Sequence, residues 1–209
     1  MEFKSPNQQM AKWPDDPVDR WRDHQRPLMP PEANPHALGP LGARKRVYLS
    51  LGSNRGNRFE HFRRAMEELA RAGVKVERVS SFYKTEPVDF GPQAWFLNCA
   101  VEVSTDLMPL QLLKAVKSVE RTLGRRAGVS KGPRPIDIDI LLYENVVVRT
   151  ATLTIPHERM SERRFVLVPL RELAPAARHP VSKRTVSELL HDSPDRGQVV
   201  RYKIETLSH

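Results

Sequence analysis

The sequence predicts an α+β fold in which an antiparallel sheet carries two helices on one of its faces. Three observations lead to this prediction. Four short apolar segments have the period of β-strands, two segments between them have the period of amphipathic helices, and 209 residues with 39% hydrophobic content can bury one core. The expected order is therefore strand, helix, strand, strand, helix, strand.

The first strand and helix open the ordered region. Val47, Leu49 and Leu51 alternate as in a half-buried strand, and GSNRGN at 52–57 supplies a turn in which Asn54 or Asn57 would cap a helix. From about residue 58 to residue 72, apolar side chains recur at spacings of three and four, and a glycine then ends the pattern. This segment predicts a strand, a turn and a helix.

The second half of the pattern is built in the same way. The valines of 74–79 indicate a strand, whereas 79–95, VSSFYKTEPVDFGPQAW, loses periodicity and is interpreted as a long irregular loop before the strand FLNCAVEV. Pro109 and Gly124 bound a second helix, and GPRPIDIDILLY at 132–143 supplies the last strand. This order matches a ferredoxin-like βαββαβ arrangement, whose other sheet face would be left for a ligand.

The ends of the chain differ from this pattern. Residues 1–45 hold eight prolines and no sustained apolar period, which predicts a disordered or loosely attached extension, and their acidic residues argue against a mitochondrial transit peptide. Residues 46–180 form the predicted domain, including an apolar segment at 163–173 that reads as a helix interrupted near Pro169. Residues 181–209 are expected to be a C-terminal extension with a short helix at 182–191 and a tail.

Charge and composition limit the classes of function. The formal net charge of +9 and the pI near 10 attract anions without choosing between RNA, a membrane surface and a nucleotide. No apolar run is long enough to cross a bilayer, so we expect a cytoplasmic protein that does not bind membranes. The single cysteine, Cys99, excludes an internal disulfide framework and is expected in the core.

The last predicted strand contains two aspartates at positions where carboxylates are costly. Because side chains alternate along a strand, Asp137 and Asp139 share one face, about 6 to 7 Å apart. Such a pair can hold Mg²⁺ while leaving its other positions to water and phosphate oxygens. Nearby basic residues, Arg134 among them, could spread charge from a nucleotide. The spacing alone equally allows two solvated aspartates on an exposed face.

Other phosphate and metal motifs are missing from the sequence. There is no GxxxxGK[ST] for a P-loop kinase, and PHERMS has Ser161 where the second histidine of a zinc hydrolase would stand. His157 alone is ambiguous between a surface group and a phosphate donor. An RNA-recognition module shares the predicted strand order, but the chain lacks the aromatic motif of such modules, so no nucleic-acid partner is expected.

Several separated segments together resemble the 6-hydroxymethyl-7,8-dihydropterin pyrophosphokinases of folate biosynthesis. From about Val47 to Pro180 they are LSLGSNRGN, SSFYKTEPV, FLNCAVEV, VERTLGRR, GPRPIDIDILLY, LTIPHERM and RRFVLVPLRELAP, and GPRPIDIDIL with the downstream PH is the specific part. The resemblance implies transfer of the pyrophosphoryl group of ATP to the hydroxymethyl of the dihydropterin, leaving AMP. It also implies a ferredoxin-like fold, two Mg²⁺ ions and ATP as co-substrate, and we expect a monomer.

The resemblance also implies roles for individual residues. Asp137 and Asp139 resemble the metal ligands, and Arg125 an arginine of a loop that closes over the site. The expected triphosphate contacts are Arg134, His157 and Arg163. The nucleotide-pocket positions are Leu113, Lys117, Glu120 and Ile140. The pterin-pocket positions are Thr85, Pro87, Val88, Phe96, Asn98 and Phe165. The segment GRRAGVSKGPR departs from the family pattern at Ala127, Ser130 and Lys131, which affects how the loop closes.

Overall fold

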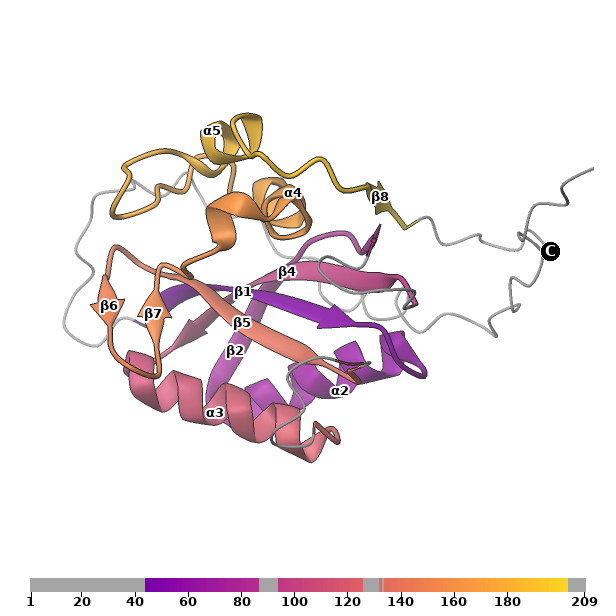
Figure 1. Cartoon of the computed structure of the whole chain (residues 1–209). Coiled ribbons are helices and arrows are strands. Elements are labelled where there is room, and N and C mark those ends of the chain that lie inside the picture. The colour runs from indigo at the N-terminus through magenta and orange to yellow at the C-terminus, as the bar shows by residue number, and fades with distance from the viewer. Residues whose placement is uncertain (1–43, 87–93, 126–131, 133, 203–209) are drawn as a thin grey trace, which may run out of the picture. The chain divides into compact units, whose positions relative to one another are not determined.

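The structure, a computed structural model, describes residues 44–86, 94–125, 132 and 134–202, which belong to one compact unit. Its helices and strands, including one 3₁₀ helix (η1), are shown in Figure 1. In chain order they are β1 (Lys45–Ser53), α2 (Arg58–Arg71), β2 (Val74–Val79), β3 (Tyr83–Thr85), β4 (Phe96–Thr105), α3 (Pro109–Thr122), β5 (Asp137–Tyr143), β6 (Val148–Arg149), β7 (Thr154–Ile155), η1 (Met160–Glu162), α4 (Arg164–Leu173), α5 (Val186–His191) and β8 (Val199–Arg201).

The described strands form a six-stranded antiparallel sheet and a separate two-stranded ribbon of β6 and β7. The large sheet has the order β5, β1, β4, β3, β8, and β2 also pairs with β4. The first and last strands of the predicted pattern, β1 and β5, are therefore neighbours, and β4 lies on the other side of β1. This order confirms the predicted ferredoxin-like arrangement.

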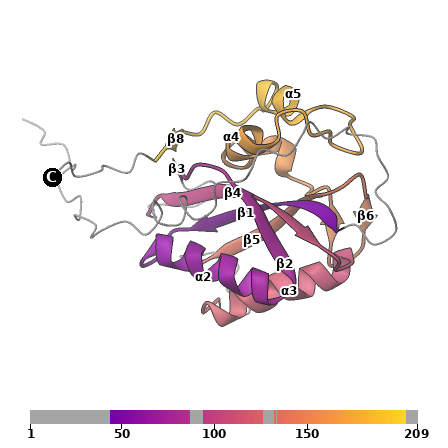
Figure 2. The ribbon, with the colours of Figure 1, turned by 180° about the vertical axis from the view of Figure 1, so that it is seen from behind.

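Both faces of the sheet carry helices. Helices α2 and α3 cover one face, as predicted, and their apolar stripes, which include Phe62 and Leu112, are buried. Helices α4 and α5 lie over the opposite face (Figures 1 and 2), where α4 packs on Tyr48 and Ala100 of the sheet. We expected this second face to be left for a ligand, but α4 and α5 cover part of it with a buried apolar cluster. Cys99 is fully buried, as predicted.

Two local predictions differ from the structure. Tyr83–Thr85 form a strand inside the predicted irregular loop, because tertiary pairing with β4 on one side and β8 on the other satisfies their backbone groups. Helix α4 runs through Pro169 without interruption. Pro169 removes one backbone donor, but its ring is buried with the apolar side of the helix, and that burial favours the continuous helix.

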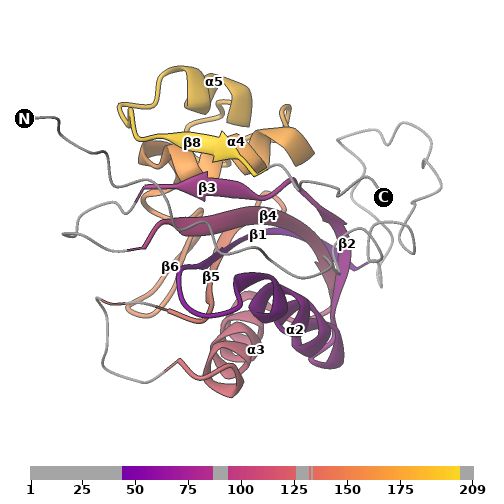
Figure 3. The same cartoon turned by 90° about the vertical axis from the view of Figure 1, so that its right-hand side faces the viewer.

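The segment after residue 180 adds to the same compact unit. Helix α5 begins at Val186, four residues later than expected, where the side chain of Thr185 accepts a hydrogen bond from the Glu188 N–H in a capping box. Strand β8 then pairs with β3 at the edge of the sheet, as Figure 3 shows. Helix α5 packs on α4 and β8 pairs with β3, and the domain boundary at residue 180 stays a prediction.

Candidate active site

The two aspartates lie at the start of the edge strand β5. Asp137 is opposite Gly52 of β1, and Asp139 is opposite Ser50, so the β1–β5 register places both carboxylates on the face that also carries α4. The apolar residues between and after them, Ile138 and Ile140, are buried on the other face. The alternation buries the isoleucines and holds the carboxylates on one stiff strand.

Asp137 contacts two arginines. One carboxylate oxygen accepts a hydrogen bond from Arg125 and the other accepts one from Arg134. Burial opposes the ionisation of Asp137, but the charges of Arg125 and Arg134 outweigh it and lower the pKa of the carboxyl. Asp137 is therefore ionised at neutral pH and brings two arginines to the site.

Glu120 of α3 joins the helix to the beginning of β5. Its buried carboxylate accepts hydrogen bonds from the Ile138 N–H at 2.8 Å, from Lys117 Nζ at 3.1 Å and from Arg125. Burial raises the pKa of Glu120, although the charges of Lys117 and Arg125 act in the opposite direction. Because Arg125 bonds both Glu120 and Asp137, these residues from α3, the following segment and β5 form one charged network.

Asp139 and His157 form a second part of the site. Burial and the neighbouring charge of Asp137 raise the pKa of Asp139, and the charges of His157, Lys117 and Arg163 partly oppose this. The backbone N–H of His157 donates to the Leu141 carbonyl of β5 at 3.0 Å, which brings the histidine beside the strand. Its Nδ1 accepts the Arg159 N–H, and burial lowers the pKa of the ring, so a neutral His157 offers an Nε2–H donor.

The donor set fits a hard divalent cation. Carboxylates are ligands that such an ion prefers, and a cation would offset the burial and the like-charge repulsion that raise the pKa of Asp139. Within the part of the chain that the structure describes, no group of three or more His, Cys, Asp or Glu side chains could hold a metal. Such an ion would therefore take its remaining ligands from water and from a substrate.

Asn54 fixes the segment that carries Arg134. Its Oδ1 accepts the Arg134 N–H at 2.7 Å, and its own N–H donates to the Arg134 carbonyl at 3.2 Å. The neighbouring Asn57 has the other role predicted for this turn, because its side chain accepts the Glu60 N–H and caps α2. The sequence predicted an asparagine cap but not the bridge from Asn54 to Arg134.

A second group of predicted residues lies on β3 and β4. Asn98 Nδ2 donates to Thr85 Oγ1 at 2.7 Å, and both side chains are buried. Gly52 makes room for this pair, since a Cβ at Gly52 would lie 2.6 Å from Asn98 Oδ1 and 3.9 Å from a ring carbon of Phe96. The amide of Asn98 thus has a fixed orientation, and its acceptor oxygen lies close over the Gly52 backbone of β1. Gly52 was not among the residues predicted for the site, although a glycine at the end of an alternating strand is a signal of close approach.

The remaining predicted residues are distributed over the adjoining elements. Arg163, the N-cap residue of α4, lies over the ring of Phe165, 5.6 Å from its centre. Leu113 lies on α3 one turn before Lys117, and Ile140 is buried on the face of β5 opposite the aspartates. Pro87 and Val88, predicted for the pterin pocket, fall outside the described residues, as does the atypical segment 126–131.

A row of directly opposed residues connects the two groups. Asp137 of β5 is opposite Gly52 of β1, and Gly52 is opposite Asn98 of β4. Neighbouring strands are about 4.8 Å apart, so the backbones of Asp137 and Asn98 lie roughly 10 Å apart across a residue without a side chain. The carboxylate–arginine group and the amide group therefore lie on the same sheet face.

Comparison with known proteins identifies the family. A family model described as 7,8-dihydro-6-hydroxymethylpterin-pyrophosphokinase matches residues 48–175. The chain belongs to this family. A 2-amino-4-hydroxy-6-hydroxymethyldihydropteridine pyrophosphokinase of Bacillus subtilis is 47% identical over 128 residues, which cover 61% of the chain and 77% of that protein. The pyrophosphokinase of the same name from Aquifex aeolicus is 39% identical over 142 residues, covering 68% of the chain and 88% of that protein.

Other relatives in the pyrophosphokinase family are much longer. A folic acid synthesis protein of Schizosaccharomyces pombe is 42% identical over 154 residues, which are 73% of the chain but 21% of that protein. The chain thus spans only about a fifth of that relative. A crystal structure of Plasmodium falciparum HPPK-DHPS, with 16% identity and a TM-score of 0.58 over 72% of the chain and 43% of that protein, has the same fold. In the described residues, no helix has the length and apolar character needed to span a membrane.

Proposed function

We propose that this pyrophosphokinase-family chain transfers the pyrophosphoryl group of ATP to the hydroxymethyl of 6-hydroxymethyl-7,8-dihydropterin, in folate biosynthesis. The hydroxyl oxygen forms a bond to the β-phosphorus, the bond from that phosphorus to the α,β-bridging oxygen breaks, and AMP leaves while the hydroxyl loses its proton. The observation that carries this proposal is the row Asp137, Gly52 and Asn98, because it sets a carboxylate–arginine group beside a buried amide on one face.

The aspartates are assigned to metal binding. Asp137 and Asp139 would hold two Mg²⁺ ions, which neutralise the triphosphate and lower the pKa of the attacking hydroxyl when bound. Arg125 and Arg134 contact Asp137, so both guanidinium groups lie beside the proposed metal site and are assigned to phosphate oxygens. His157, with its Nε2–H donor, and Arg163 are assigned to the same triphosphate. This arrangement would stabilise the charge that develops during transfer.

The two substrates would be recognised by different residues. Leu113, Lys117, Glu120 and Ile140 are assigned to the nucleotide, beside the junction of α3 and β5. A flat heteroaromatic ring would lie beside the Asn98 amide, for which Gly52 makes room, and its donor edge would face Asn98 Oδ1. Phe96 and Phe165 would supply aromatic faces, and Thr85 fixes the amide. Pro87 and Val88 complete the assignment from sequence.

Release of AMP from ATP tests the proposal. The purified chain is incubated with ATP and Mg²⁺, with and without 6-hydroxymethyl-7,8-dihydropterin, and AMP and the dihydropterin diphosphate are separated by chromatography. We expect both products in equal amounts only when the pterin is present, and none after removal of Mg²⁺ by a chelator. AMP without a pterin requirement, or no AMP from a folded sample, would reject the proposed activity.

A monomeric state and a cytoplasmic location belong to the same proposal. Relatives from Arabidopsis thaliana and Pisum sativum carry the name mitochondrial folate synthesis bifunctional protein, so location requires its own measurement. Sedimentation equilibrium of the purified chain should give the mass of one chain, 23.9 kDa. Fractionation of cells that produce the chain, followed by immunodetection, should find it in the cytoplasmic fraction; recovery with an organelle would contradict the assignment.

A further inference from the structure

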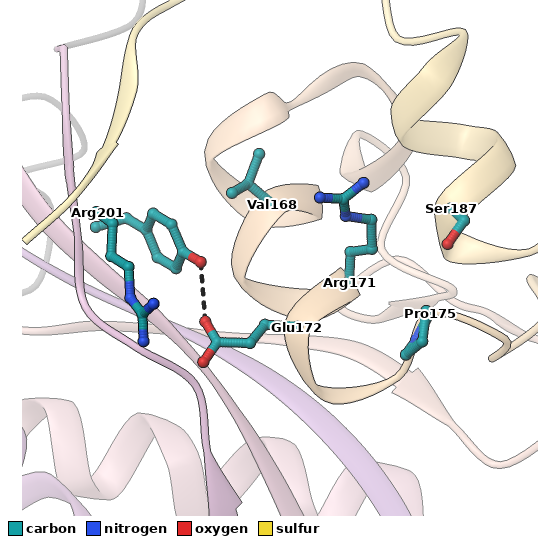
Figure 4. Close-up of a pocket in the computed structure, with 7 residues that line it drawn as sticks. Val168, Arg171, Glu172, Pro175, Ser187 and Arg201 are labelled. Atoms are coloured by element: carbon teal, nitrogen blue, oxygen red, sulfur yellow. Dashed lines mark hydrogen bonds between the residues drawn. The ribbon is translucent and has the colours of Figure 1, made fainter.

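A pocket lies at the far end of the row that contains Asp137 and Asn98. Asn98 is opposite Tyr83 of β3, and Tyr83 is opposite Arg201 of β8. Around this end of the row, residues of β3, β8, α4, α5 and the segment between the two helices line an open pocket of about 420 Å³, drawn in Figure 4. None of the residues that line it was assigned to ATP, metal or pterin.

Glu172 forms a fixed wall of this pocket. Its carboxylate accepts hydrogen bonds from the backbone N–H and the hydroxyl of Ser81, at 3.0 and 2.9 Å, and from the hydroxyl of Tyr83 at 2.8 Å. Burial and the Glu172 charge raise the pKa of Tyr83 to about 12, so the phenol keeps its proton and remains a donor to Glu172. Because donors from the chain already satisfy Glu172, it ties α4 to the sheet and is not needed as a ligand group.

Two arginines give the pocket its charge. Arg201 enters from β8 and Arg171 from α4 (Figure 4), and the charges of both act on Tyr83. Arg201 Nε donates to Ser81 Oγ at 2.9 Å, which holds the guanidinium in place while its terminal nitrogens have no acidic partner among the described residues. Within the same described part of the chain, no carboxylate pairs with Arg171. The two cations exceed the single, already bonded carboxylate of Glu172.

The rest of the lining is suited to the body of a small molecule. Val168 of α4 and Pro175 supply apolar surface, and Ser187 of α5 supplies a hydroxyl at the rim. The other lining residues are polar or charged, so the pocket combines a limited apolar surface with the polar groups that a small-molecule site uses to fix its ligand. Guanidinium groups bind carboxylates and phosphates through paired N–H donors, so two arginines that have no acidic partner among the described residues favour an anion.

We propose that this pocket binds a small organic anion whose carboxylate or phosphate group lies between Arg171 and Arg201 and whose apolar part rests on Val168 and Pro175. The site is distinct from the candidate active site, since β4 separates its strands β3 and β8 from β1, which carries Gly52, and from the aspartate strand β5. Its ligand lies next to β3, the strand that also carries Thr85, so occupancy is positioned to affect the orientation of Asn98.

Nuclear magnetic resonance of the full ¹⁵N-labelled chain tests this site without ATP or pterin. Phenyl phosphate, benzoate and benzyl alcohol are titrated separately, since they share one ring and differ in the charged group. We expect an anion to shift the side-chain Nε–H signals of Arg171 and Arg201 and the amide signal of Ser187, with one saturation curve. Binding of phenyl phosphate alone identifies a phosphate ester as the ligand class, and binding of benzoate alone identifies a carboxylate.

Matched arginine variants test whether the anion binds in this pocket. Arg171→Ala should weaken binding about tenfold, because one charge-assisted contact is lost, whereas Arg149→Ala removes the same charge from exposed β6 and should leave binding unchanged. Signals of Asp137 and His157 report any binding at the candidate active site and are fitted separately. The proposal is overturned by equal shifts with benzyl alcohol, by equal weakening in both variants, or by no shift at Arg171 and Arg201 up to the solubility limit of both anions.

Discussion

Arg125 bonds both Asp137 on β5 and Glu120 on α3. This double contact means that the carboxylate assigned to metal binding is already neutralised by an arginine that a neighbouring helix holds in place. Asp139, two residues along the same strand, has no arginine bonded to it among the described side chains, and its pKa is raised by burial and by Asp137. The two aspartates therefore have different electrostatic environments although they share one face.

Replacement of Asp139 should separate activity from stability. Because a buried carboxylate with a raised pKa costs stability when ionised, Asp139→Asn should keep or increase the free energy of unfolding at pH 7 while abolishing pterin-dependent AMP release. Urea unfolding and the AMP assay measure the two effects. Asp192→Asn on the surface is the control and should retain activity. Near-parental turnover of Asp139→Asn at saturating Mg²⁺ would show that the metal assignment is wrong.

Gly52→Ala should damage pterin binding. The new Cβ would lie 2.6 Å from Asn98 Oδ1, so the amide must shift and its hydrogen bond to Thr85 is strained. We expect the KM for the dihydropterin to rise more than tenfold and the free energy of unfolding to fall by about 1 to 3 kcal/mol. Gly73→Ala is the matched control, since it strains a positive φ at the end of α2 without touching Asn98. An unchanged KM for the dihydropterin in Gly52→Ala would contradict the assignment of Asn98 to pterin binding.

The two asparagines of the first turn should have different effects. Asn57→Ala removes the cap of α2 and should lower the free energy of unfolding by about 1 kcal/mol without changing kcat. Asn54→Ala removes the acceptor of the Arg134 N–H, so Arg134 is less well positioned and kcat should fall at unchanged KM for the pterin. Steady-state kinetics and urea unfolding of both variants test this. Equal kcat values would contradict the positioning role of Asn54.

His179 predicts a local dependence of stability on pH. Its Nδ1 accepts the backbone N–H groups of Val181 and Ser182, and burial lowers the pKa of the ring below 6.5. Since the folded state favours the neutral ring, the stabilisation is complete above pH 6.5 and is lost as the pH falls through the lower, folded pKa. Histidine NMR titration should give the lowered pKa, and His179→Ala should flatten the decrease in stability below pH 6.5. A titration midpoint above 6.5 would contradict this.

Removal of residues 1–45 tests the predicted domain boundary. We expect the shortened chain to keep the kcat and KM of the full chain, because every residue assigned to the site follows Val47. The AMP assay and a thermal unfolding measurement compare the two chains. A large loss of turnover in a folded, shortened chain would show that the N-terminal segment takes part in the reaction.

Local patterns in the sequence were sufficient to predict the main helices and strands and the shared face of the two aspartates. The two-residue period of β5 determined that Asp137 and Asp139 share a face, and the helical stripes determined which sides of α2 and α3 are buried. These predictions succeed because periodicity follows from backbone geometry within a single element. The family resemblance supplied the substrate and the assigned roles, which spacing alone left open between a metal site and solvated aspartates.

Only the tertiary structure decided which of these residues meet. Three features join segments that are separated by tens of residues in the chain. They are the row Asp137, Gly52 and Asn98, the bridge from Asn54 to Arg134, and the pocket that contains Arg171 and Arg201. Strand register and helix packing set these neighbours, and both depend on how the whole core fits together. The short strand β3 was missed for the same reason, because its pairing partners, β4 and β8, are supplied by the fold and not by its own three residues.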